Sequence, residues 1–125
     1  MERARRPDRS HGFRPALRGI GAMLTSQPNA RVHLAATAGV LGLSAWLRLS
    51  GPEWCWIVLA IALVWVAEAF NTAIEELADA VRPERDPGIG RAKDVAAGAV
   101  LLAALASVTN GLFVLGPYLL FLWLA

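Results

Sequence analysis

The sequence predicts an all-α integral membrane protein, with an amphipathic surface helix followed by three transmembrane helices. Of its 125 residues, 56% are hydrophobic and only 18% are charged, and the mean hydropathy is +0.47. Residues 54–67 and 95–125 contain no charged side chain, and residues 32–47 contain one ionisable side chain, His33. A soluble core of this size is too small to bury such runs, and the composition is too apolar for a disordered chain.

The N-terminal segment is predicted to be a tail followed by a surface helix. We expect residues 1–11 to form a disordered basic tail and residues 12–125 to form a single membrane domain. Within residues 12–27, apolar side chains recur at steps of four, three and four: Phe13, Leu17, Ile20 and Leu24. This spacing predicts a helix lying in the membrane interface. Glycines in the same stretch lower helix propensity, so a loop with chance periodicity is the alternative.

Three further helices are predicted to span the bilayer, over about residues 30–49, 53–81 and 92–124. A Ser-Gly-Pro turn separates the first two spans, and an Arg-Pro pair follows the second. Basic residues are concentrated before the first span and between the second and third. The positive-inside rule therefore places both segments, and the N-terminus, in the cytoplasm. We expect a multi-pass protein of the inner (cytoplasmic) cell membrane.

The second span carries an unusual set of polar residues. They are spaced by three, four and four positions and so share one helix face: Glu68, Asn71, Glu75 and Asp79. Glu68 directly follows an apolar run, and an acid inside the membrane is a functional candidate by default. The alternative is a helix that has left the bilayer with a solvated acidic face. Glu68 and Glu75 are candidates for a base and a metal ligand, because carboxylates together with substrate phosphates suit Mg²⁺.

Further polar groups are predicted at the same cytoplasmic level. Lys93 is the only lysine, and with Asp94 it lies at the predicted start of the third span. Free N–H groups at a helix start attract phosphate, although a snorkelling lysine and an Asp N-cap explain the pair equally well. Asn29 is a candidate helix cap, Arg31 a candidate anchor, and His33 a structural hydrogen-bonding group. Convergence of acids, amides and cations is typical of phosphoryl transfer.

These residues resemble the prokaryotic diacylglycerol kinase and undecaprenol kinase family, over a stretch from Phe13 to about Leu115. The resemblance is carried by ALRGI at 16–20, NARVH at 29–33, EAFNTAIE at 68–75 followed by Asp79, and AKDVAAGAV at 92–100. It implies a homotrimer with shared active sites. It also implies ATP- and Mg²⁺-dependent phosphorylation of a lipid hydroxyl, either of diacylglycerol or of undecaprenol.

The resemblance also implies roles for individual residues. By position, Glu68 is similar to the family's proposed general base, Asn71 to a residue that orders the site, and Glu75 to a Mg²⁺ ligand. The implied nucleotide-binding residues are Lys93, Asp94, Glu84 and Asp86. Asp86 stands where some members have histidine.

A second group of residues lies before the first span. Gln27 stands at the position of a second carboxylate metal ligand, and it offers a carbonyl oxygen without a charge. Asn29 and Arg31 are candidate substrate contacts. The Asn-x-Arg-x-His block that they form with His33 is more similar to the undecaprenol kinase branch.

The expected partners are a lipid alcohol, ATP, the membrane and further copies of the chain. No nucleic acid is expected, because the arginines are not interleaved with stacking aromatic residues. Two alternatives stay open. One is a non-enzymatic oligomeric carrier or scaffold, in which Glu68 is a proton or cation site. The other is an inactive family member, since Gln27 lacks the charge of a carboxylate.

Overall fold

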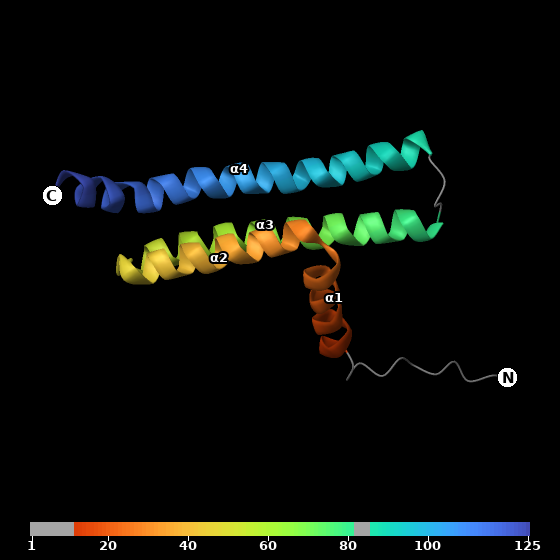
Figure 1. The fold of residues 1–125 in the computed structure, drawn as a ribbon, viewed down its shortest axis with the longest axis horizontal. Coiled ribbons are helices and arrows are strands. Elements are labelled where there is room, and N and C mark those ends of the chain that lie inside the picture. The colour runs from red at the N-terminus through yellow and green to blue at the C-terminus, as the bar shows by residue number, and fades with distance from the viewer. Residues whose placement is uncertain (1–11, 82–85) are drawn as a thin grey trace.

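The computed structural model describes residues 12–81 and 86–125, and within these ranges the chain forms four α-helices. The helices are α1 (Phe13–Ser26), α2 (Pro28–Trp46), α3 (Gly51–Val81) and α4 (Pro87–Leu124). Helices α2, α3 and α4 run along a common long axis, whereas α1 projects crosswise from the start of α2 (Figure 1). The all-helical prediction is confirmed. The predicted basic tail, residues 1–11, lies outside the described residues.

Local sequence determines where α2 begins. Gln27 has an extended backbone and forms the N-cap, and Pro28 occupies the first turn. Proline is favoured there because its missing N–H has no partner to lose at that position. Asn29 consequently lies inside the first turn, so the expectation that it caps the helix is wrong.

The turn between α2 and α3 is formed by residues that the sequence assigned to the first span. Residues 47–49 are not helical because Arg48 adopts a positive φ of 56°, in the left-handed region that ends a helix. At the start of α3 the Glu53 carboxylate accepts hydrogen bonds from the backbone N–H and the hydroxyl of Ser50, at 2.8 and 2.7 Å. These bonds provide an acceptor for the backbone N–H and the hydroxyl of Ser50 at the point where the chain enters α3.

Helix α4 begins at Pro87, earlier than the predicted start near residue 92. The carboxylate of Asp86 caps it by accepting from the backbone N–H groups of residues 88 and 89, at 2.7 and 3.2 Å. Proline at the first helical position again has no N–H to satisfy. Lys93 and Asp94 therefore lie well inside the helix, and the alternative that Asp94 is the N-cap is wrong.

Two helices of the described ranges, α3 and α4, are long and apolar enough to cross a membrane, each containing an 18-residue stretch with a mean hydropathy of 2.0. Helix α2 has 19 residues and is not among them. Its first turns carry Asn29, Arg31 and His33, which lower its hydropathy. The structure thus supports a membrane protein with two apolar helices, and the third span stays a prediction.

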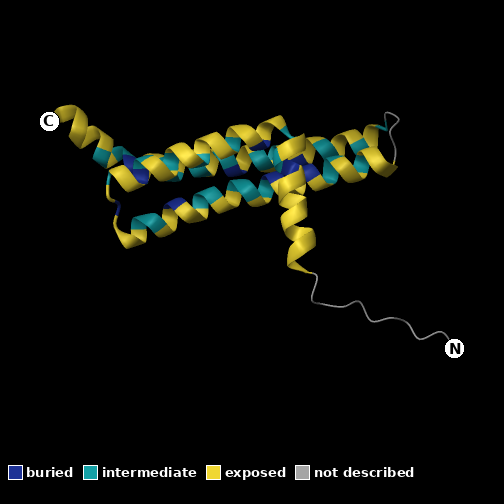
Figure 2. Cartoon of the chain, turned by 60° about the horizontal axis from the view of Figure 1, so that its bottom comes forward, coloured by how far each residue is buried: buried dark blue, intermediate teal, exposed yellow. Residues whose placement is uncertain are grey.

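The chain by itself buries few apolar side chains (Figure 2). The main packing is lengthwise between α3 and α4, with an apolar cluster formed by Leu49, Ile57 and Leu115. On α1, Phe13 is 86% exposed and Leu17 is 67% exposed. Apolar surface of this extent is expected to contact lipid or other protein chains. The few buried side chains include a polar group in the middle of α3, described next.

Candidate active site

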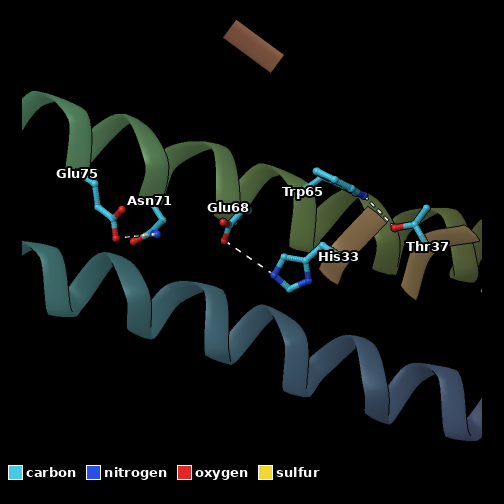
Figure 3. Close-up of polar contacts among 6 residues, drawn as sticks. All are labelled: His33, Thr37, Trp65, Glu68, Asn71 and Glu75. Carbon is cyan, nitrogen blue, oxygen red and sulfur yellow. Dashed lines mark hydrogen bonds and ion pairs between the residues drawn. The ribbon is translucent and has the colours of Figure 1, made fainter. Parts of the chain in front are cut away.

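Glu68, in the middle of α3, is the only ionisable side chain that is buried within residues 12–81 and 86–125. It is 1% exposed. Its Oε2 atom has no hydrogen-bond partner in this part of the chain, and it lies 3.8 Å from Nε2 of His33 (Figure 3). Burying a carboxylate without a hydrogen bond costs free energy. Such a group is expected to complete its interactions with a ligand.

Asn71 and Glu75 follow Glu68 along the same face of α3 (Figure 3). Asn71 Nδ2 donates a long hydrogen bond of 3.4 Å to Glu75 Oε1. Asn71 is 6% exposed, and within the described chain neither its Oδ1 nor the Oγ1 of Thr72 has a hydrogen-bond partner. Buried polar atoms are nearly always paired. The concentration of unpaired atoms here makes this face of α3 a candidate binding site.

These side chains line an open cleft of about 300 Å³ between α2, α3 and α4. The polar residues lining the cleft are Asn29, Glu68, Asn71 and Glu75, and α4 contributes Ala97, Val100, Leu101 and Ala104. The structure therefore brings Asn29 together with the acidic face of α3, although the two lie far apart in the sequence. Among the described residues, no lysine or arginine lines the cleft.

Lys93 approaches the same face of α3 from α4. Its Nζ lies 2.9 Å from Oδ1 of Asp79, which is one helical turn beyond Glu75. Lys93 therefore lies beside Asp79, the last residue of the acidic face, and does not line the cleft. Because both partners are partly exposed, the ion pair adds little stability. Asp94 is exposed and does not line the cleft.

The predicted nucleotide loop is described only in part. Glu84 lies outside the described residues. Asp86 caps α4, so its carboxylate occupies two of the N–H groups that the helix start offers. The N–H groups around Lys93 lie within the helix. The sequence-based expectation that a free helix terminus beside Lys93 attracts phosphate is therefore wrong.

Two other predicted residues, Gln27 and Arg31, lie where α1 meets α2. Arg31 Nη2 donates to the backbone oxygen of Thr25 at 2.8 Å, near the end of α1. Gln27 forms the N-cap of α2 without a side-chain cap bond. Neither side chain lines the cleft of the single chain. The metal role of Gln27 and the substrate role of Arg31 stay predictions.

Three residues form a contact between α2 and α3 that the sequence did not reveal (Figure 3). The rings of His33 and Trp65 meet edge to face, with centroids 6.4 Å apart and an interplanar angle of 68°. Trp65 Nε1 donates to Oγ1 of Thr37 at 3.0 Å. Helical spacing places His33 and Thr37 on one face of α2, but it does not show which face of α3 they meet.

An apolar groove of about 220 Å³ lies beside the cleft, also between α2, α3 and α4. The polar side chains in its lining are His33, Thr37 and Ser107. Ala104 lines both the groove and the cleft. The two cavities therefore meet near the contact between His33 and Glu68.

The comparison with known families agrees with this arrangement, since the model of the prokaryotic diacylglycerol kinase family matches residues 14–115. The chain belongs to this family. An undecaprenol kinase from Bacillus subtilis is 37% identical over 107 residues, which cover 86% of this chain and 87% of the relative. A diacylglycerol kinase from Synechocystis is 36% identical over 109 residues, covering 86% of this chain and 62% of the relative.

A more distant relative is the diacylglycerol kinase of Escherichia coli K12, which is 28% identical over 91 residues, covering 73% of this chain and 75% of the relative. Membership of a lipid kinase family confirms both the family and the enzyme class predicted from the sequence. It argues against the alternative of a non-enzymatic carrier or scaffold.

The cleft of this diacylglycerol kinase family member has a donor set that fits Mg²⁺. Glu75 offers a carboxylate, and Asn71 offers an amide oxygen that is unpaired within the described chain. The Glu68 carboxylate lies about one helical turn before Asn71. In residues 12–81 and 86–125, no three or more His, Cys, Asp or Glu side chains converge on a metal position. Mg²⁺ commonly takes only one or two carboxylates and completes its shell with phosphates and water. The cleft therefore suits an ion that arrives together with a nucleotide.

Proposed function

We propose that the chain catalyses ATP- and Mg²⁺-dependent phosphorylation of the hydroxyl of a membrane lipid alcohol, diacylglycerol or undecaprenol. The observation that carries this proposal is the position of Glu68. It is a buried carboxylate with an unpaired oxygen, at the place where an apolar groove meets a polar cleft. A lipid hydroxyl and a water-soluble nucleotide can meet at such a boundary and at few other places in a membrane.

In the proposed reaction, Glu68 is the general base. One of its carboxylate oxygens accepts the hydroxyl proton while the lipid oxygen forms a bond to the γ-phosphorus. The bond from that phosphorus to the β–γ bridging oxygen breaks, and ADP leaves with the electron pair. Glu75 and the Oδ1 atom of Asn71 are proposed to hold Mg²⁺, which when bound neutralises phosphate charge. Lys93 is proposed to exchange Asp79 for a phosphate oxygen.

We propose that the active site is completed by a neighbouring copy in a homotrimer. Phosphoryl transfer needs positive charge beside the phosphates, yet the cleft is lined by acids and amides. Within the described residues no lysine or arginine lines the cleft, and Arg31 donates to a carbonyl of α1, so Lys93 is the one cation that the chain is proposed to supply. The extensive exposed apolar surface of α3 and α4 also supports association with further helices.

The crosswise helix α1, together with the arginines of the N-terminal segment, supports the proposed placement in the inner cell membrane. Its exposed apolar stripe, which includes Phe13, Leu17 and Ile20, suits a helix lying in the cytoplasmic interface. The N-terminus is then cytoplasmic, and α2 crosses the bilayer as a third span beside α3 and α4. Asn29 and Arg31 would lie at the level of the lipid headgroups, close to α1.

A direct assay tests the proposed function. The purified protein is placed in lipid vesicles with Mg²⁺ and radiolabelled ATP, and diacylglycerol or undecaprenol is added in separate reactions. We expect a labelled lipid phosphate from at least one alcohol, and no product when Mg²⁺ is removed with a chelator. Product from neither alcohol, with Mg²⁺ and ATP present, would contradict the proposal.

A second candidate function, that of an inactive family member, is suggested by Gln27 and can be tested. Gln27 provides no negative charge for a metal, and its side chain does not reach the cleft of the single chain. If the wild-type protein is inactive and Gln27→Glu restores lipid phosphorylation, the chain is an inactive member of the family. If wild type is active, we expect Gln27→Glu to reduce the Mg²⁺ concentration needed for half-maximal rate.

A further inference from the structure

The contact between His33 and Glu68 lies between the two cavities of the molecule. His33 lines the apolar groove, Glu68 lines the polar cleft, and Ala104 of α4 belongs to both linings. The Nε2 atom of His33 is 3.8 Å from Oε2 of Glu68 (Figure 3). A lipid alcohol that lies in the groove with its hydroxyl toward the cleft therefore passes this pair of side chains.

The imidazole ring is held in place by α3. Trp65 is one turn before Glu68 on the same helix and packs against the ring edge to face. The indole is fixed in turn by its hydrogen bond to Thr37, one turn after His33 on α2. This arrangement restricts the position of His33 relative to Glu68. By contrast, Glu68 Oε2 has no hydrogen-bond donor in the described chain.

We propose that His33 is a positioning residue for Glu68 in the phosphoryl transfer reaction. Its Nε2–H group donates to Oε2 and directs the other carboxylate oxygen toward the lipid hydroxyl. The 3.8 Å separation closes to a hydrogen bond when the substrate occupies the groove, as catalytic hydrogen bonds commonly tighten in the complex. This inference rests on the proposed function, because it assigns His33 a role through the base.

Kinetics with matched variants test the positioning role. We expect His33→Ala to lower kcat by about 10- to 100-fold, because a misplaced catalytic group slows the reaction without weakening nucleotide binding. The KM for ATP should stay within about twofold of wild type. His33→Gln should recover part of kcat, because its side-chain amide can still donate to Glu68. Thr109→Ala is the control, since Thr109 is exposed, bonds only within α4 and lines neither cavity.

The outcomes separate the two proposals. A His33→Ala protein that keeps wild-type kcat, or that changes only KM, would overturn the positioning role and leave the kinase proposal intact. A wild-type protein that phosphorylates no lipid alcohol would overturn the kinase proposal and the positioning role with it. Equal losses of kcat in His33→Ala and Thr109→Ala would also overturn the positioning role.

A spectroscopic measurement tests the contact without relying on turnover. Solid-state NMR of ¹⁵N-histidine-labelled protein, in bilayers that contain the lipid alcohol, reports the hydrogen bonding of the His33 Nε2 atom, whose signal is distinguished from that of the second histidine by its loss in His33→Ala. We expect the Nε2 signal to shift between wild type and Glu68→Gln, and to stay unchanged in Thr109→Ala. An Nε2 signal that is the same in wild type and Glu68→Gln would overturn the proposed contact.

Discussion

The first turn of α3 and its second half differ in how their carboxylates are hydrogen-bonded. At its first turn, Glu53 accepts hydrogen bonds from Ser50 and from the hydroxyl of Tyr118 on α4, the latter at 2.8 Å. In its second half, Oε2 of Glu68 and Oδ1 of Asn71 are buried and have no hydrogen-bond partner among the described residues. Both regions place a carboxylate between α3 and α4, but within the described residues Oε2 is hydrogen-bonded in Glu53 and not in Glu68.

This difference separates a structural site from a functional one. The Oε2 atom of Glu53 accepts from three donors of the chain itself, and these bonds join the first turn of α3 to α4. Burying an oxygen without a hydrogen-bond partner costs folding free energy. Such oxygens are typical of sites where a ligand or another chain supplies the partner. Substitutions in the second half of α3 should therefore affect activity, and substitutions at Glu53 and Tyr118 should affect stability.

The largest expected effect is that of Glu68→Gln. Replacing the proposed base by an isosteric amide should lower kcat by about 10²- to 10⁴-fold. The melting temperature should be unchanged or higher, because the variant removes a buried charge that has no paired donor. Rates of lipid phosphorylation and thermal unfolding in the same detergent check both expectations. A strong loss of stability would show that Glu68 has a structural role, as Glu53 does.

The next effect concerns the metal. Glu75→Gln should raise the Mg²⁺ concentration that gives half-maximal rate by about 10- to 100-fold, because a neutral amide is a weaker ligand than a carboxylate. A titration of Mg²⁺ at saturating ATP measures this shift, and high Mg²⁺ should recover part of the rate. A lowered rate with an unchanged Mg²⁺ dependence would show that Glu75 does not hold the ion.

A smaller effect, on stability alone, is expected from Tyr118→Phe. The variant removes one of the three donors to Glu53 and leaves the ring in place, so the melting temperature should fall by about 3 °C. Thermal unfolding measures the shift. Lipid phosphorylation below the melting temperature should match wild type. An activity loss comparable to that of Glu68→Gln would remove the distinction between the two ends of α3.

The smallest effect is expected from Ser107→Ala. The Ser107 hydroxyl donates to the backbone oxygen of Ala60 at 2.9 Å, which joins α4 to α3. Hydrogen bonds between membrane helices contribute about 0.6 kcal/mol on average. Equilibrium unfolding should show a destabilisation of that order. A loss several times larger would mean that this bond, rather than apolar packing, determines the pairing of α3 and α4.

Much of the site could be predicted because helix periodicity alone places Glu68, Asn71 and Glu75 on one face. Periodicity applies within a helix, so it could not show which residues of other helices meet that face. The contacts of Glu68 with His33 and of Glu53 with Tyr118 join residues far apart in the chain. They depend on the register between helices, which no local pattern determines.

The helix ends show a different limit of the sequence. Pro87 lies five residues before the predicted start of the last helix, near residue 92. In the structure the same proline occupies the first helical turn and Asp86 supplies the cap. Proline is compatible with both arrangements, so the outcome depends on whether a capping side chain precedes it. Because α4 starts earlier than predicted, Lys93 lies in the interior of the helix, beside Asp79, and not at its start.

The most direct test uses Mn²⁺ in place of Mg²⁺ together with a non-hydrolysable ATP analogue. Lys93 is the only lysine and Tyr118 the only tyrosine, so each gives a single NMR signal in bilayers. Their partners on α3, Asp79 and Glu53, are about 40 Å apart along the helix. We predict that paramagnetic Mn²⁺ broadens the Lys93 Nζ signal and leaves the Tyr118 ring signal sharp. Broadening of Tyr118, or of neither residue, would contradict a nucleotide site at the acidic face of α3.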